Sequence, residues 1–182
     1  MIELNVIERA IEVAAKAHQS QYRKGTNIPY ITHPYAVCMI LLKNGCSEEV
    51  VAAGILHDTL EDTPLTFEDI RNVFGEKIAE LVKECSEPNK DFSWEERKQL
   101  TIKHLETAPK DVCLIACADK LHNIRSIRYE LESIGEKIWE RFKRGKEKQE
   151  WYYREIVDRL AITLEGEQIF NELKEEVEKF FS

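Results

Sequence analysis

Apolar residues recur every three or four positions along almost the whole chain. In the first segment they occupy positions 6, 7, 10, 11, 14 and 15. That spacing is the period of a helix with one buried face, whereas a half-buried strand alternates every second residue. We find no convincing strand pair, internal repeat or low-complexity run. We therefore predict an all-α fold, with residues 1–182 as a single helical domain, a size that allows a substantial core.

Gly and Pro residues divide this pattern into helices. Residues 21–34 contain a Gly, an Asn and two prolines and are expected to form a loop. Pro34 suits the first position of a helix that ends at Gly45, with His33 just before that helix. Ser47 can cap the next one. The expected further helices cover residues 48–62, 67–75, 93–107, 110–130 and roughly 147–181.

Charge and cysteine content limit the possible partners and compartment. The net charge is −8 and the pI about 5.3, which argues against a general nucleic-acid-binding or anionic-membrane surface. An anionic substrate would therefore need a local group of basic residues. The first 18 residues mix charges with apolar positions and read as neither a signal peptide nor a membrane span. Five cysteines without a C-x-x-C pair favour buried free thiols in a reducing, cytoplasmic location.

One acidic stretch, GILHDTLEDT at residues 54–63, follows a strongly apolar run. It places His57, Asp58, Glu61 and Asp62 within six positions. On a continuous helix these side chains span an arc of about 140°, so their charges would repel unless a cation lay among them. Imidazole and carboxylate ligands without a thiolate suit Mn, Fe or Zn. The alternative is a solvated acidic helix end, which the helix dipole disfavours.

Two further positions support a metal site. His33 lies at a loop-to-helix junction, where a lone histidine is usually a cap or a surface residue. Asp119 ends an apolar run, and Asn123 follows one turn later on the same face. A buried aspartate needs a partner, which could be a metal, Lys120, Arg125 or a backbone cap.

Several segments together resemble a known family. The order His33, His57-Asp58, Asp119 is similar to that of the HD superfamily of metal-dependent phosphohydrolases. More narrowly, AHQSQYRKGTNIPYITHP, AAGILHDTLEDT, FG at 74–75 and ADKLHNIRSI resemble the hydrolase domain of RelA/SpoT-type alarmone enzymes, above all their stand-alone small hydrolases. The resemblance extends over roughly residues 10–130. It implies a single HD-domain helical bundle.

The resemblance also implies roles for particular residues. One divalent metal ion, usually Mn²⁺, would be held by His33, His57, Asp58 and Asp119. The acidic catalytic pair would be Glu61 and Asp62, of which we favour Glu61 as the base because it lies one turn from His57. The substrate would contact Arg23, Lys24 and Asn123.

The expected activity is removal of the 3′-diphosphate from guanosine tetra- or pentaphosphate, giving pyrophosphate and GDP or GTP. One alternative keeps the metal centre but acts on another phosphorylated nucleotide, for example the 2′-phosphate of NADPH. Another is a regulator that binds the alarmone without hydrolysing it, although a sensor has no need for the acidic pair. The linker at 85–92 and the C-terminal third match the family only loosely, so they leave the exact substrate open. The oligomeric state, a homo-oligomer included, is open as well.

Other histidine, arginine and aromatic residues have expected positions or supporting roles. We expect His18 and His122 to support metal ligands from behind, and His104 to lie on the surface. Arg125 would contact either a phosphate or a structural carboxylate. The aromatic residues 151–153 are expected in the core.

Overall fold

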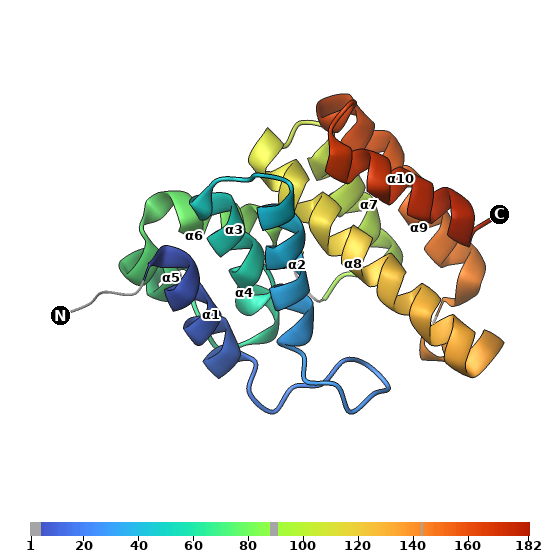
Figure 1. Cartoon of the computed structure of the whole chain (residues 1–182), viewed down its shortest axis with the longest axis horizontal. Helices are drawn as coiled ribbons and strands as arrows, with labels where there is room; N and C mark the ends of the chain where they lie inside the picture. Colours follow the sequence, from blue (N-terminus) through green and yellow to red (C-terminus); the bar gives the residue numbers. More distant parts are fainter. Residues whose placement is uncertain (1–4, 88–90, 143) are drawn as a thin grey trace.

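The computed structural model describes residues 5–182 except 88–90 and 143, and within these residues the regular elements are helices (Figure 1). The all-α prediction is confirmed; the only described bridge pairs Tyr22 with Pro29. Among the described residues, no helix is long and apolar enough to cross a membrane. The elements are α1 (Val6–Ala17), α2 (Thr32–Lys43), α3 (Glu48–Leu56), α4 (Thr59–Asp62), α5 (Phe67–Phe74), α6 (Glu76–Cys85), α7 (Trp94–Leu105), α8 (Lys110–Ile134), the 3-10 helix η1 (Gly135–Arg141), α9 (Gly145–Leu164) and α10 (Gln168–Phe180).

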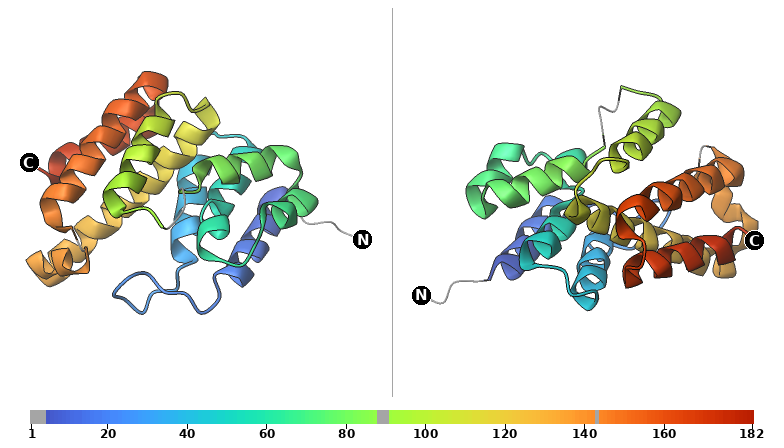
Figure 2. Two further views of the ribbon diagram at one scale, coloured as in Figure 1. Left: turned by 180° about the vertical axis from the view of Figure 1, so that it is seen from behind. Right: turned by 90° about the horizontal axis from the view of Figure 1, so that it is seen from above.

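The long helix α8 lies at the centre of the molecule. It packs against α2, α3 and α6 on one side and against α9 and α10 on the other. Figures 1 and 2 show α1 to α6 gathered on one side of α8, with α7, α9 and α10 on the other. Buried apolar side chains from both groups form one continuous cluster, which holds the two groups in a fixed relation through α8.

Helix ends follow local side-chain chemistry. At the start of α5, the Thr66 side chain accepts from the Asp69 amide while Asp69 accepts from the Thr66 amide at 2.9 Å. Ser93 and Glu96 form the same reciprocal pair at the start of α7. Each pair satisfies two amides that the first helical turn leaves without partners.

The expected helix over residues 48–62 is wrong in one respect, because the chain leaves the regular helix at His57 and Asp58. The Thr59 hydroxyl donates to the Leu56 carbonyl at 2.6 Å, and His57 Nδ1 lies 2.8 Å from the Gly54 carbonyl oxygen. These side chains occupy carbonyls that helical amides would otherwise use. The arc calculated for a continuous helix therefore does not apply.

Two other boundaries differ from the sequence expectation. α2 begins at Thr32, so His33 and Pro34 both lie inside its first turn. The helix expected over 147–181 is divided into α9 and α10 at Gly166, whose φ of 89° lies in the left-handed region that glycine tolerates best. The expected linker at 85–92 falls partly on residues 88–90, which lie outside the described part of the chain.

Candidate metal centre and active site

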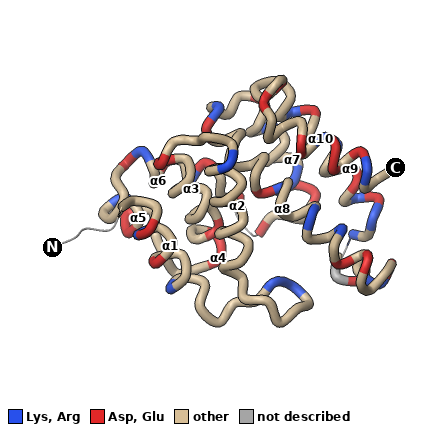
Figure 3. Tube along the Cα trace, in the orientation of Figure 1, with Lys and Arg blue, Asp and Glu red and all other residues tan. Residues whose placement is uncertain are grey.

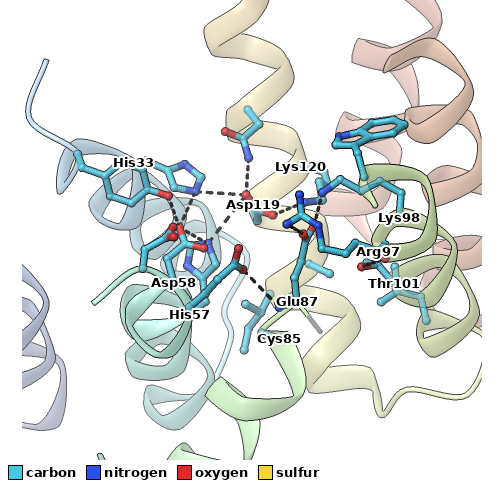
Figure 4. A pocket seen from close by; sticks show the side chains of 18 of the residues that line it. His33, His57, Asp58, Cys85, Glu87, Arg97, Lys98, Thr101, Asp119 and Lys120 are labelled. Atoms are coloured by element: carbon cyan, nitrogen blue, oxygen red, sulfur yellow. Dashed lines mark hydrogen bonds and ion pairs between the residues drawn. The ribbon is translucent and has the colours of Figure 1, made fainter. Parts of the chain in front are cut away.

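Three distant segments meet at one buried point. His33 comes from the first turn of α2, His57 and Asp58 from the turn after α3, and Asp119 from the middle of α8. Ligand atoms of the first three lie within 4.8 Å of one another. Asp119 Oδ1 lies 3.2 Å from His33 Nε2 and 3.9 Å from His57 Nε2. Figure 4 shows these side chains directed toward one another, so the structure brings the four predicted ligands together.

Both histidines present the same ring nitrogen to this point. His57 Nδ1 is held by the Gly54 carbonyl at 2.8 Å, and His33 Nδ1 lies 2.7 Å from His122 Nδ1. The rings are 1% and 4% exposed for His33 and His57 respectively. His57 Nε2 is buried without a hydrogen bond of good geometry, although Asp58 Oδ2 is 3.1 Å away. Such an arrangement, with Nδ1 fixed from behind and Nε2 directed inward, fits a metal ligand.

The carboxylates are also held from behind. The Tyr30 hydroxyl donates to Asp58 Oδ2 at 2.7 Å. Lys120 Nζ lies 2.6 Å from Asp119 Oδ2, and the Asn123 amide donates to Asp119 Oδ1. The residue pattern predicted no role for Tyr30, whose only signal was its place as a hydroxyl-bearing aromatic residue three positions before His33.

The charges of the cluster depend strongly on one another. Burial lowers the pKa of His57, but the carboxylates of Asp58 and Asp119 outweigh burial and raise that pKa to about 9. Burial raises the pKa of Asp58, but His57 and His33 hold it below its usual range. Burial likewise opposes ionisation of Asp119, whose pKa Lys120 and His33 keep well below its usual range. Without a metal, the cluster therefore stabilises a proton on His57 that a divalent cation would replace.

The acidic pair lies beside this cluster, at the end of α4. Glu61 and Asp62 line the same cavity of about 350 Å³ as the four predicted ligands. Burial, followed by the charges of Glu87, Asp62 and Asp58, raises the pKa of Glu61. A carboxyl group with a raised pKa accepts a proton more readily at neutral pH than an ordinary glutamate, which suits a general base.

The histidine before the loop has an indirect role. His18 Nδ1 lies 2.8 Å from Gln21 Oε1, and the Gln21 amide donates to the Asp62 carbonyl at 2.7 Å. His18 therefore supports the loop and α4 rather than a metal ligand. The histidine that contacts a predicted ligand is His122, which lies beside His33.

Basic side chains complete the cavity. The Arg23 guanidinium donates to Asn123 Oδ1 at 2.8 Å, so two predicted substrate-binding residues meet. Arg23 and Lys24 form the basic pair in the loop between α1 and α2 (Figure 3). α7 directs Arg97 and Lys98 into the cavity, although the residue pattern predicted no role for either (Figure 4). The sequence shows that both residues are basic. It does not show that they reach the site, because the packing of α7 determines which of its side chains point there.

A second cavity, of about 270 Å³, adjoins the first. The two share Arg23, Tyr30, Lys98, Lys120 and Asn123 as lining residues. Of these two cavities, Lys24 lines the second and not the first. Its remaining wall is partly apolar and aromatic, formed by Ile127, Ile138, Phe142, Tyr152 and Tyr153.

The structure also places the other residues for which the sequence predicted a position. Arg125 pairs with Glu172 at 2.8 Å, which is the structural alternative. Tyr152 and Tyr153 are buried as expected, but they also line the second cavity. His104 is partly exposed and lies 3.2 Å from a carboxylate oxygen of Glu84.

The fold and the site define a class: a helical protein with a buried histidine–aspartate cluster fit for a metal ion, beside an acidic pair. The chain belongs to the HD domain family, whose match covers residues 10–146. HD domains bind a divalent metal ion, and His33, His57 and Asp58 are a group able to hold one.

Individual relatives of known name are similar to this chain over most of its length. The chain is 42% identical over 129 residues to a GTP pyrophosphokinase of Streptomyces coelicolor, which matches 69% of this chain but only 15% of that protein. It is 37% identical over 126 residues to the guanosine-3′,5′-bis(diphosphate) 3′-pyrophosphohydrolase MESH1 of Xenopus tropicalis, covering 68% of this chain and 70% of MESH1. A solved structure of a metazoan ortholog of SpoT that hydrolyzes ppGpp superimposes with a TM-score of 0.82 at 27% identity, covering 98% of this chain and 97% of that one.

Proposed function

We propose that this chain is a metal-dependent hydrolase that removes the 3′-diphosphate from guanosine tetra- or pentaphosphate. The products would be pyrophosphate and GDP or GTP. The observation that carries the proposal is the meeting of His33, His57, Asp58 and Asp119 in one cavity with the Glu61–Asp62 pair. The names of MESH1 and of the SpoT ortholog supply the substrate class.

The metal we propose is Mn²⁺, held by His33, His57, Asp58 and Asp119. Two imidazoles and two carboxylates without a thiolate suit an ion of intermediate hardness. The buried Nε2 of His57 supports this assignment, because it faces the carboxylates of Asp58 and Asp119 without a hydrogen bond of good geometry. When bound, a divalent ion supplies Lewis acidity, which lowers the pKa of water and neutralises phosphate charge.

The protein's own groups then handle the proton. Glu61, with its raised pKa, orients the attacking water and accepts its proton. Asp62 adjoins it in the cavity and orients either the water or the substrate's sugar. Asn123 and Lys120 hold Asp119 in place while this occurs.

The substrate's nucleotide would occupy the two adjoining cavities. Arg23 and Lys24 would neutralise phosphate, and the Arg23 guanidinium can also stack on a base. The apolar and aromatic wall beyond Asn123 offers a surface for the purine and ribose. The chain spans only part of its long relatives, so the proposal concerns the hydrolase reaction alone.

A substrate panel tests this function. The Mn²⁺-loaded protein is incubated with guanosine tetraphosphate, NADPH and a set of nucleoside di- and triphosphates, while pyrophosphate and phosphate are measured separately. We expect pyrophosphate from guanosine tetraphosphate in a 1:1 ratio with GDP. Phosphate release from NADPH alone would point to the alternative substrate. Tight binding of guanosine tetraphosphate without turnover in any metal would make the chain a regulator.

We further propose a single domain working in the cytoplasm, without nucleic-acid partners. The five free cysteines, three of them buried, support a reducing environment. The acidic net charge opposes binding to nucleic acid. Sedimentation analysis would establish whether the chain forms a homo-oligomer.

A further inference from the structure

Glu87 is an acidic side chain among the basic residues of the active-site cavity. It lines the same cavity as the metal cluster, and its side chain is only 15% exposed. Glu87 Oε2 lies 3.0 Å from Arg97 Nη1, and Oε1 contacts Lys98 Nζ. Figure 4 shows this carboxylate between α8 and the two cations of α7. One internal anion thus binds both cations that α7 contributes to the cavity.

Besides Glu87, Lys98 faces an aromatic ring, with its Nζ 4.8 Å from the centroid of the Tyr152 ring. The third cation of this wall, Lys120, pairs with Asp119. Burial opposes ionisation of Glu87, but Lys98, Lys120 and Arg97 outweigh it and lower its pKa, so Glu87 is charged at neutral pH. A phosphate group entering the cavity therefore meets Arg97 and Lys98 already paired with Glu87, which cancels one of their two positive charges.

We propose that Arg97 and Lys98 form a phosphate-binding subsite that Glu87 occupies in the free protein, so that a phosphate-bearing ligand must displace the Glu87 carboxylate to bind there. Displacement is favourable for phosphates, because they carry more charge and more acceptor oxygens than a carboxylate. The competition lowers the affinity for every ligand that uses this subsite. This proposal rests on the proposed function in one respect, namely that the ligand of the subsite is taken to be a polyphosphate substrate.

Stability and ligand affinity, measured on the same variant, distinguish this role from a purely structural ion pair. An ion pair kept only for stability, at cations that bind no ligand, would make Glu87→Gln less stable, because two partly buried cations would lose their partner. It would leave the affinity for phosphate ligands unchanged. An internal competitor would instead make ligand binding tighter once its charge is removed. The two roles therefore predict different affinities: no change for a structural ion pair and tighter binding for an internal competitor.

Binding of inorganic pyrophosphate to the metal-free full chain tests the proposal. Isothermal titration calorimetry in EDTA would compare the wild type with Glu87→Gln and the control Glu84→Gln. Glu84 lies three residues earlier and pairs with His104 outside the cavity. We expect Glu87→Gln to bind pyrophosphate about tenfold more tightly, since one charged hydrogen-bonded competitor is removed. Glu84→Gln should bind as the wild type does.

Two further variants keep the test decisive. Adding Lys98→Gln to Glu87→Gln should remove the gain in pyrophosphate affinity. Glu87→Asp keeps the charge on a shorter side chain and should give an intermediate affinity. This second variant serves as the test if Glu87→Gln proves unstable. Unchanged or weaker binding by a folded Glu87→Gln, together with wild-type binding by Glu87→Asp, would overturn the proposal. The hydrolase function is judged separately, by turnover of guanosine tetraphosphate, which pyrophosphate binding does not require.

Discussion

Individual side chains in this site have separable tasks, although the sequence packs several of them into six positions. His57 directs its buried Nε2 toward the carboxylates of Asp58 and Asp119, whereas Glu61 lies beside the cluster with its pKa raised by burial and by neighbouring acids. The first residue suits a metal ligand and the second a proton acceptor. Tyr30 and His122 support the ligands from behind.

Substitution separates these tasks. Glu61→Gln should lower kcat by about 10²–10⁴-fold, since it removes a general base while keeping the shape of the side chain. It should keep its metal, whereas His57→Ala should lose both metal and activity. Metal content by mass spectrometry and initial rates at saturating substrate measure the two effects. Full activity of Glu61→Gln would exclude it from the mechanism.

The proton on His57 gives a pH dependence. In the metal-free protein its pKa is raised to about 9, so at pH 7 a metal must replace a bound proton. Metal affinity should therefore rise with pH up to about 9, and binding at pH 7 should release a proton. Calorimetry in buffers of different ionisation enthalpy counts that proton. An affinity independent of pH between 7 and 9 would contradict this charge state.

The same shift affects the stability of the metal-free protein. A folded-state pKa above the unfolded value means that the folded state binds the proton more tightly. This contribution is fully present below the unfolded pKa of about 6.5 and is lost as pH rises to about 9. Urea unfolding in EDTA should therefore show a decline in stability over this range, and His57→Gln should show a smaller decline.

Helix packing determines where these residues meet. α2 and α3 approach closely at Gly54, where an added Cβ would lie 2.3 Å from Leu41 Cδ1. The same Gly54 carbonyl holds His57 Nδ1, and α2 carries His33. The crossing of these two helices therefore sets the distance between the two histidines.

Gly54→Ala should disturb this crossing. Leu41 is fully buried, so its displacement should cost about 1–3 kcal/mol, partly offset by the better helix propensity of Ala. Metal affinity should fall as well, because both histidines shift. Urea unfolding and metal titration measure the two effects. Leu41→Val in the same chain should recover part of the loss; strictly additive losses would contradict a steric contact between these two positions.

At the scale of the whole molecule, the cluster connects α2 and the α3–α4 turn to α8. Asp119 supplies the contribution of α8, which also packs against α9 and α10. A metal bound to these segments would therefore stabilise the folded chain as a whole, because the unfolded chain does not hold the ligands together.

Metal addition should raise the melting temperature. At 100 times its Kd, a ligand adds about 2.7 kcal/mol to stability, which for a chain of this size is about 5–10 °C. Asp119→Asn should reduce that shift strongly, while Asp111→Asn, an exchange in the first turn of the same helix, should leave it intact. Differential scanning calorimetry with and without Mn²⁺ measures both. Equal shifts in the two variants would remove Asp119 from the site.

The sequence by itself determined the helical class, because the helical period depends on short-range spacing. The four ligands stay a prediction, which the resemblance of the motifs implies and which the meeting of these side chains in one cavity supports. The sequence did not predict the break at His57, where the His57 and Thr59 side chains take up carbonyls of the preceding helical turn. It did not reveal Tyr30, Arg97 or Glu87 either. Their roles arise when α7, α8 and the loop before α2 surround one cavity, and contacts between such distant segments are fixed only by tertiary packing.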